Sequence, residues 1–169
     1  MNNFVIANPQ KCIGCRTCEV ACVMAHADKN LLLEPEQNII FNAKLSVIKT
    51  ARISAPIHCH HCEDAPCANA CPTSAIVNKE GAVYIIEANC IGCKTCAIVC
   101  PFGAIDLTES NRLESSVVAN KCDLCLGREK GPACVEVCPT KALSLVKGQD
   151  IQQSLENKRC QAALELNGQ

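Results

Sequence analysis

The sequence predicts an α+β fold made of two tandem modules, each built from short strands and short helices around cysteine-rich loops. Sixteen of the 17 cysteines fall into four groups of four. A short apolar run precedes each group and another follows three of them, which indicates a repeated strand–loop–helix–strand unit. Only 2% of the residues are aromatic and there is no Trp, so the core is thin and needs a metal or another cross-link for support.

Cysteine spacing is the strongest signal in the chain. The first and third groups read C-x2-C-x2-C-x3-C, and proline follows the last cysteine of the second, third and fourth groups. Three thiolates at this spacing can bind three corners of an iron–sulfur cube, and Gly14 or Gly92 lets the backbone approach it. This is the bacterial ferredoxin run, in which the fourth cysteine reaches a second cluster. The spacing therefore predicts four 4Fe-4S clusters in two bacterial-ferredoxin-like modules.

The predicted cluster ligands are the grouped cysteines. They are Cys12, Cys15, Cys18 and Cys22; Cys59, Cys62, Cys67 and Cys71; Cys90, Cys93, Cys96 and Cys100; and Cys122, Cys125, Cys134 and Cys138. Zinc is the main alternative, because the second and fourth groups alone resemble zinc knuckles, and a mixed zinc and iron–sulfur protein stays open. Zinc ribbons need neither a third cysteine two residues after the second nor the Cys-Pro step, so we expect iron–sulfur clusters.

The start of the chain bears on the oxidation state of these thiols. Residues 1–12 contain no basic n-region and no long apolar stretch, which predicts no signal peptide, and no apolar run is long enough to span a membrane. We therefore expect a cytoplasmic protein with reduced thiols rather than disulfides. The formal net charge of −1, without long runs of either sign, gives no support to binding of nucleic acid or of a membrane surface.

Apolar runs on either side of the cysteine groups predict the strands. The runs that precede the groups are FVIAN, ISAPI, VYIIEAN and SVVAN, with ISAPI the weakest, and those that follow are CPTSAIV, CPFGAID and CPTKALSLV. The three-residue gap before each fourth cysteine fits one turn of helix, and a proline directly after that cysteine ends the helix. NKEG at 78–81 predicts the turn of a hairpin.

Residues 27–57 interrupt the repeat. LLLEPEQ predicts a turn around Pro35, and the β-branched residues from 38 to 57 predict one or two extra strands. Two interpretations of this β-rich insert stay open, a lid over the first cluster and a docking face for a partner. Because no proline follows Cys22, we expect the helix before it to continue through VMAHADKN and to end at Asn30.

Residues 149–169 predict a C-terminal helical tail. Its apolar positions recur at roughly helical spacing, namely Ile151, Leu155, Ala162 and Leu166. Asn167 and Gly168 then supply stop signals. The sequence does not decide whether this amphipathic helix covers the body of the chain or packs on another subunit.

The order of the groups, with C-x2-C-x4-C-x3-C-P second and C-x2-C-x8-C-x3-C-P fourth, resembles a known family. It is similar to the four-cluster electron-transfer subunits of molybdopterin oxidoreductases, and most similar to the small iron–sulfur proteins of formate hydrogenlyase, formate dehydrogenase and hydrogen-dependent carbon dioxide reductase. The resemblance covers most of residues 1–146. Its stretches are CIGCRTCEVAC, CHHCEDAPCANACP, CIGCKTCAIVCPFGAI and NKCDLCLGREKGPACVEVCPTKAL.

The resemblance implies nested pairing of the groups, whereas the spacing alone equally allows the first group to pair with the second and the third with the fourth. Nested pairing gives the ligand sets Cys12, Cys15, Cys18 and Cys138; Cys122, Cys125, Cys134 and Cys22; Cys59, Cys62, Cys67 and Cys100; and Cys90, Cys93, Cys96 and Cys71. The first module then comprises residues 1–57 with 112–148, including the insert at 27–57, and the second comprises 58–111. The missing proline after Cys22 marks the seam between the modules.

A cluster with four thiolate ligands has no open coordination position, so the sequence predicts electron transfer rather than catalysis. No glycine-rich nucleotide loop, HExxH motif or segment large enough for a pterin or flavin is present. The resemblance implies a subunit that relays electrons between a formate dehydrogenase-type catalytic subunit and a hydrogenase or other redox partner. The alternatives are a free polyferredoxin shuttle, a scaffold that self-assembles through the insert or the tail, and an accessory protein of formate dehydrogenase.

Several residues near the clusters invite a more specific interpretation. His58, His60 and His61 flank two cysteines and either tune that cluster or serve as polar loop residues, the reading we favour. Three lysines lie next to cysteines and either raise a cluster potential or are solvated, namely Lys11, Lys94 and Lys121. Cys160, on the tail beside Lys158 and Arg159, is interpreted as an incidental free thiol rather than a redox sensor.

Overall fold

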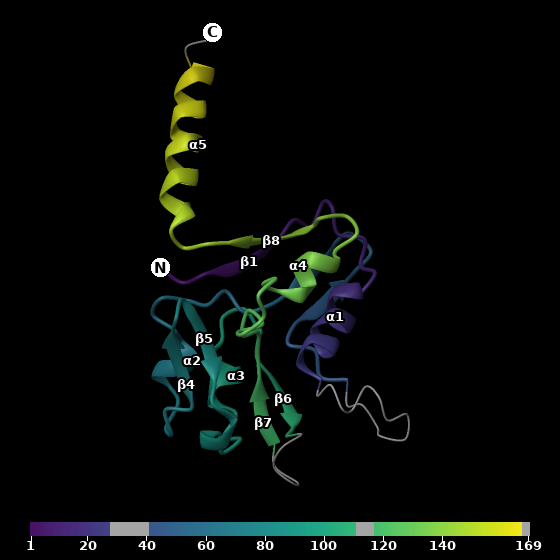
Figure 1. Cartoon of the computed structure of the whole chain (residues 1–169), viewed down its shortest axis with the longest axis vertical. Helices are drawn as coiled ribbons and strands as arrows, with labels where there is room; N and C mark the ends of the chain where they lie inside the picture. Colours follow the sequence, from purple (N-terminus) through teal and green to yellow (C-terminus); the bar gives the residue numbers. More distant parts are fainter. Residues whose placement is uncertain (28–40, 111–116, 167–169) are drawn as a thin grey trace.

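Pairs of short antiparallel strands, each close to a short helix, make up the fold (Figure 1). The computed structural model describes residues 1–27, 41–110 and 117–166. The strands in these residues are β1 Phe4–Ala7, β2 Ser46–Lys49, β3 Ser54–Ile57, β4 Ile76–Lys79, β5 Ala82–Ile85, β6 Asp106–Glu109, β7 Val117–Asn120 and β8 Leu143–Val146. The helices are α1 Thr17–His26, α2 Pro66–Asn69, α3 Thr95–Val99, α4 Ala133–Val137 and α5 Asp150–Leu166, with a short 3₁₀ helix at Glu87–Asn89.

The strands of the described residues pair in four two-stranded sheets. β1 pairs with β8, with Phe4 opposite Val146, so the two ends of the cysteine-bearing region lie side by side. The other three sheets are hairpins, β2 with β3, β4 with β5 and β6 with β7. Every predicted strand is therefore confirmed, and the insert supplies the expected extra strands as the β2–β3 hairpin.

The β4–β5 hairpin turns where NKEG predicts it. Asn78 and Lys79 end β4, and Glu80 and Gly81 form the turn with φ of 56° and 75°. Two consecutive left-handed residues match the two-residue turn that suits the twist of a hairpin, and glycine at the second position removes the Cβ penalty.

The short helices differ in how far they extend past their last cysteine. α2, α3 and α4 all end before the Cys-Pro step, as predicted. α1 continues past Cys22, also as predicted, but it ends at His26 because Ala27 is extended (φ −68°, ψ 143°). The expected end at Asn30 was therefore wrong, and Asn30 and Pro35 lie outside the described residues. Nδ1 of His26 lies 2.7 Å from the carbonyl oxygen of Cys22, so the side chain satisfies a carbonyl of the last helical turn.

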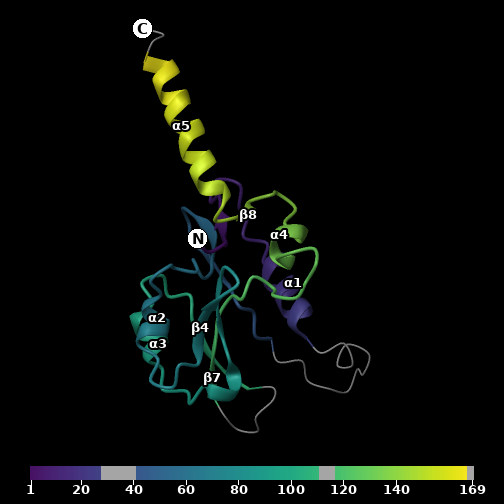
Figure 2. The same cartoon turned by 60° about the vertical axis from the view of Figure 1, so that its left-hand side comes forward.

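Two apolar cores lie behind the cysteine loops. α1 packs against α4 beside the first core, which includes Val5, Val47 and Leu143, and α2 packs against α3 beside the second, with Ile76 and Val83 (Figure 2). The two cores follow the predicted modules except that Ala82 lies in the first core and Ala119 in the second. The division into 1–57 with 112–148 and 58–111 stays a prediction, since β6 and β7 pair across its boundary.

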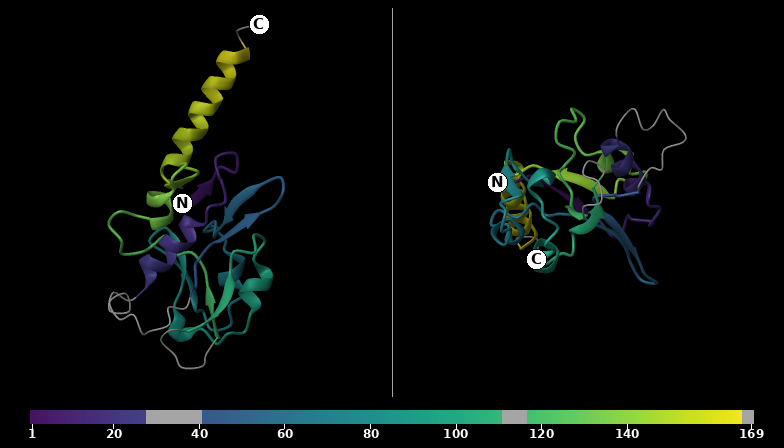
Figure 3. Two further views of the ribbon diagram at one scale, coloured as in Figure 1. Left: turned by 90° about the vertical axis from the view of Figure 1, so that its right-hand side faces the viewer. Right: turned by 90° about the horizontal axis from the view of Figure 1, so that it is seen from below.

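Helix α5 extends away from the rest of the molecule (Figures 1 and 3). Its side chains from Gln152 to Glu165 are exposed, so it does not cover the body of the chain. The predicted helix is confirmed over Asp150–Leu166, whereas its stop signals Asn167 and Gly168 lie outside the described residues. Packing on another subunit stays a prediction. None of the helices in the described residues is both long and apolar enough to cross a membrane.

We expect Gly92→Ala to destabilise the protein more than Gly103→Ala. Both glycines are left-handed (φ 65° and 59°), so alanine costs about 1–2 kcal/mol at either position. A Cβ at Gly92 would also lie 2.4 Å from the carbonyl oxygen of Val117, whereas at Gly103 it meets nothing within 4 Å. Overpacking of this kind typically costs a further 1–3 kcal/mol or so. The check is the urea midpoint of both variants by anaerobic circular dichroism, and equal midpoints would show that the close approach to Val117 is unimportant.

Candidate metal centres

Three cavities in the structure are each lined by four cysteines. The first is lined by Cys12, Cys15, Cys18 and Cys138, the second by Cys59, Cys62, Cys67 and Cys100, and the third by Cys71, Cys90, Cys93 and Cys96. Their volumes, counting the part open to solvent, are about 340, 340 and 360 Å³. Nearly equal volumes with the same donor set indicate that the three cavities suit the same occupant.

The remaining grouped cysteines lie between α1 and α4. Cys22 and Cys134 are both buried in the first core, where Cys122 packs against them. Cys125 completes this set, because the charges of Cys125 and Cys22 both act on the Cys134 thiol. The structure thus brings the cysteines together in the nested combination, the first group with the fourth and the second with the third. The assignment of each cysteine to an iron atom stays a prediction.

Backbone geometry turns N–H groups toward the sulfur atoms. Arg16 and Lys94 have φ of 62° and 69°, which directs the following turn into α1 and α3. Amide N–H···Sγ distances of 3.2–3.4 Å join His61 to Cys59, Lys44 to Cys22, Ala104 to Cys100, Leu124 to Cys122 and Ala142 to Cys138. Amides directed at sulfur are what the loop spacing predicts, and such hydrogen bonds help to set the potential of an iron–sulfur cluster.

The buried thiols fit a bound cation. Burial raises the pKa of Cys18 to about 11 and that of Cys134 to about 12, and neighbouring cysteines add to the rise at Cys134. Burial also raises the pKa of Cys122. Thiolates brought together in low dielectric repel one another, and iron or another metal cation supplies the missing positive charge. The donor set therefore fits 4Fe-4S clusters, as each cavity offers four sulfurs and a mostly apolar wall.

The insert covers the first cavity. Val47 of β2 and Pro56 of β3 line it together with the cysteines. Of the two interpretations of residues 27–57, the lid is the one that the described part of the insert supports. Ile48 and Ile53 on the same hairpin are 47% and 48% exposed, so the docking interpretation stays open for its outer face.

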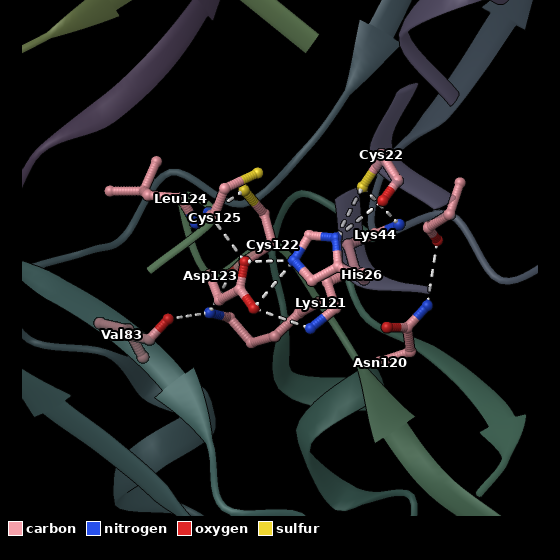
Figure 4. Close-up of polar contacts among 11 residues, drawn as sticks. Cys22, His26, Lys44, Val83, Asn120, Lys121, Cys122, Asp123, Leu124 and Cys125 are labelled. Atoms are coloured by element: carbon pink, nitrogen blue, oxygen red, sulfur yellow. Dashed lines mark hydrogen bonds and ion pairs between the residues drawn. The ribbon is translucent and has the colours of Figure 1, made fainter. Parts of the chain in front are cut away.

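A polar network ties the insert to the fourth cysteine group (Figure 4). Lys44 Nζ lies 2.8 Å from the Asp123 carboxylate, and His26 Nε2 lies 2.9 Å from the same carboxylate. Burial disfavours the charged ring, but the hydrogen bonds to Asp123 and Cys22 and the negative charge of Asp123 together outweigh it and raise the pKa of His26 to about 10. None of these three residues was predicted as a site residue, because their contacts join segments far apart in the sequence.

Two of the three flanking histidines are buried, so the interpretation as polar loop residues was wrong for them. His58 is 5% exposed, and its Nε2 donates to the carbonyl oxygen of Val5. His61 is 1% exposed, and its Nδ1 accepts from the Val83 N–H at 3.0 Å. Burial, with Lys121 second, lowers the pKa of His61 to about 3, so the neutral ring carries its proton on Nε2. That atom is buried and has no hydrogen-bond partner in the described residues, which leaves a donor for a bound group.

The remaining flanking residues are at the surface. His60 is exposed and stacks on Phe102 with ring centroids 3.9 Å apart, at the wall of the second cavity. Lys11 and Lys94 are exposed, as predicted for solvated lysines, whereas Lys121 is 2% exposed. Cys160 is exposed and belongs to α5, the helix that extends away from the rest of the molecule in Figure 1.

Two family models match the chain. Both describe a 4Fe-4S dicluster domain, one over residues 50–148 and the other over residues 11–75. Together they span all four cysteine groups, and they bear out the expected 4Fe-4S clusters.

Three relatives from Escherichia coli (strain K12) each match 80% of this chain. The putative electron transport protein YsaA is 46% identical over 138 residues, covering 84% of its length. The electron transport protein HydN is 45% identical over 147 residues, covering 82% of its length. Formate hydrogenlyase subunit 2 is 42% identical over 164 residues, covering 77% of its length. The chain spans only 20% of the longer putative oxidoreductase AegA, to which it is 44% identical.

We expect the anaerobically purified chain to contain about sixteen iron and sixteen sulfide ions, four of each per cluster. The sixteen grouped cysteines supply the ligands, so Cys160→Ser is the matched control and should leave the content unchanged. Iron and sulfide assays with inductively coupled plasma detection of zinc check this. Half the iron together with stoichiometric zinc would contradict it and favour the mixed zinc and iron–sulfur protein.

Proposed function

The chain belongs to the family of 4Fe-4S dicluster proteins, and we propose that it relays electrons between a formate dehydrogenase-type catalytic subunit and a hydrogenase or other redox partner. The single observation that carries this proposal is the gathering of the grouped cysteines into nested four-sulfur sites. A role in electron transfer follows from the family itself, and the partners are the proposed part.

Each site is proposed to hold one cluster through four thiolates. Each site takes three cysteines from one loop and a fourth from another, and we name it after the first cysteine of its three-cysteine loop. The sites are the Cys12 site (Cys12, Cys15, Cys18, Cys138), the Cys122 site (Cys122, Cys125, Cys134, Cys22), the Cys59 site (Cys59, Cys62, Cys67, Cys100) and the Cys90 site (Cys90, Cys93, Cys96, Cys71). A bound cluster supplies one-electron redox chemistry. Four cysteines complete each site, so the protein offers no position for substrate, and we propose a non-catalytic carrier.

The sites form a path with exposed ends. The Cys12 and Cys122 sites share the α1–α4 pair, and the Cys59 and Cys90 sites share the α2–α3 pair. Cys15 and Cys93 are the exposed members of the grouped cysteines, and they belong to the Cys12 site and the Cys90 site. The electron path therefore has two ends at the surface, the Cys12 and Cys90 sites, and the Cys122 and Cys59 sites lie between them.

The partner proposal rests on the relatives and on the expected reduced thiols. Formate hydrogenlyase subunit 2 is by its name a subunit of formate hydrogenlyase, HydN is by name an electron transport protein, and YsaA is by name a putative one. We propose that this chain, like formate hydrogenlyase subunit 2, is a subunit of a complex, and that this complex is cytoplasmic. The exposed α5 favours a docked subunit over a free polyferredoxin, which needs no such tail. The scaffold and accessory roles are the remaining alternatives.

The nested assignment predicts which cysteines affect the same cluster. Cys12→Ser and Cys138→Ser should perturb one and the same electron paramagnetic resonance signal, because their side chains line one cavity. Cys71→Ser should instead perturb the signal changed by Cys93→Ser. Serine replaces sulfur by oxygen at nearly constant size, so the spectral change reports ligation. If Cys138→Ser instead shares its signal with Cys93→Ser, the groups pair sequentially and the assignment is wrong.

An anaerobic pull-down of the tagged chain, followed by mass spectrometry, tests the function. We expect it to recover a molybdopterin- or tungstopterin-dependent formate dehydrogenase, with or without a hydrogenase. The matched variant lacks residues 149–169 and should lose these partners while keeping its iron, because α5 makes little contact with the body. Recovery of the brown protein alone from both samples would contradict the dedicated subunit and favour the shuttle or the accessory role.

A further inference from the structure

Lys121 is a lysine buried in the interior of the protein, and Figure 4 shows it beside Val83. It follows β7 directly and is 2% exposed, although it is adjacent to Cys122. Its Nζ donates to the carbonyl oxygen of Val83 and, at 2.8 Å, to that of Cys122. Both acceptors are neutral, and within the described residues no carboxylate forms an ion pair with this ammonium group. The charge is therefore buried without being cancelled.

Lys121 joins the two halves of the structure. Val83 belongs to β5 and to the second core, while Cys122 belongs to the Cys122 site between α1 and α4. The Val83 N–H is bonded to His61, so the free edge of β5 is satisfied by two side chains, one of them charged. The lysine charge acts on Cys62 and Cys67 of the Cys59 site as well as on Cys122. It thus lies at the junction of the two central sites.

Glu19 is the opposite case at one end of the path. It lies in α1 next to Cys18, is 6% exposed, and accepts the Val47 N–H at 2.6 Å. Arg16 approaches it at 3.8 Å but is 62% exposed, so solvent weakens this ion pair. Histidines aside, Glu19 and Lys121 are the buried acidic and basic side chains of the described residues.

Neighbouring charges do not remove this asymmetry. Asp123 lies next to Cys122, but its carboxylate is paired with both Lys44 and His26. Lys11 and Lys94 lie next to Cys12 and Cys93 and are exposed, so water and salt screen them. The unscreened charges are one cation between the central sites and one anion at the Cys12 site.

The charge of a site decides how easily it accepts an electron. Reduction adds one negative charge to a cluster, so a nearby cation stabilises the reduced form and an anion opposes it. Burial makes both effects larger, because a low dielectric weakens charge interactions less than water does.

We propose that the two buried charges grade the reduction potentials along the path: Lys121 raises those of the Cys122 and Cys59 sites, and Glu19 lowers that of the Cys12 site. This inference rests on the ligand sets proposed above. The central sites are then reduced first and hold electrons away from the surface, and the Cys12 site is the more reducing end. Lys121 and Glu19 act on the clusters through their side-chain charges and do not coordinate iron.

The test is an anaerobic redox titration of the full-length holoprotein, followed by electron paramagnetic resonance. Lys121→Gln should lower the reduction equilibrium constant of two clusters about tenfold, equivalent to about 59 mV for one electron. Lys121→Arg keeps the charge and should restore the wild-type values. Glu19→Gln should shift one cluster in the opposite direction, by several-fold. Lys94→Gln, the same change at an exposed lysine beside a cysteine, should shift none.

The iron content distinguishes a failure of the proposed ligand sets from a failure of the inference about the two charges. A wild-type chain with far fewer than about sixteen irons would refute the proposed ligand sets. Full iron content in Lys121→Gln with unshifted potentials would overturn the inference and reduce Lys121 to a structural link between β5 and the Cys122 loop. If Lys121→Gln loses iron, Glu19→Gln decides, and an unshifted titration of that variant overturns the grading. A loss of stability in both Lys121→Gln and Lys121→Arg, with the potentials of Lys121→Gln unchanged, likewise assigns a structural role.

Discussion

The meeting of cysteines from distant segments around one cavity is the constraint on which the rest of the structure depends. Each cavity takes three sulfurs from one loop and a fourth from another, so the chain must bring those loops together before any site is complete. The surrounding side chains are small, and the largest fully buried ones are His61, Val5 and Val83. Four-residue strands, three helices of four or five residues and the ten-residue α1 cannot hold such loops by apolar burial alone. Metal ligation and folding are therefore coupled in this architecture.

Much of this architecture follows from local spacing. The strands, the short helices and the Glu80–Gly81 turn were all predictable, because each depends on residues within a few positions of one another. The continuation of α1 past Cys22 was predictable from the missing proline, but its end was not. α1 ends at His26, whose ring contacts Asp123 nearly one hundred residues away, and no local pattern encodes that contact.

The burial of polar side chains was the main feature that could not be predicted from the sequence. Lys94 and Lys121 are each adjacent to a cysteine, and the sequence gives no reason to expect one to be exposed and the other buried. The structure separates them because Lys121 reaches the free edge of β5 from another part of the chain, while Lys94 begins α3 at the surface. His58 and His61 were misjudged for the same reason. Spacing identifies the sulfur ligands, whereas the charges around them depend on tertiary contacts.

The nesting of the loops also has a consequence for biosynthesis. On the nested assignment, the Cys59 and Cys90 sites have all their sulfurs once Cys100 has left the ribosome, whereas the Cys12 site waits for Cys138. Domains fold as the chain emerges, so the inner pair can be loaded first and becomes the template on which the outer pair closes. Meanwhile Cys12, Cys15 and Cys18 stand as an incomplete set, open to oxidation or to the wrong metal. The Cys12 site, whose three-cysteine loop is synthesised first, is thus the last of the four sites to be completed.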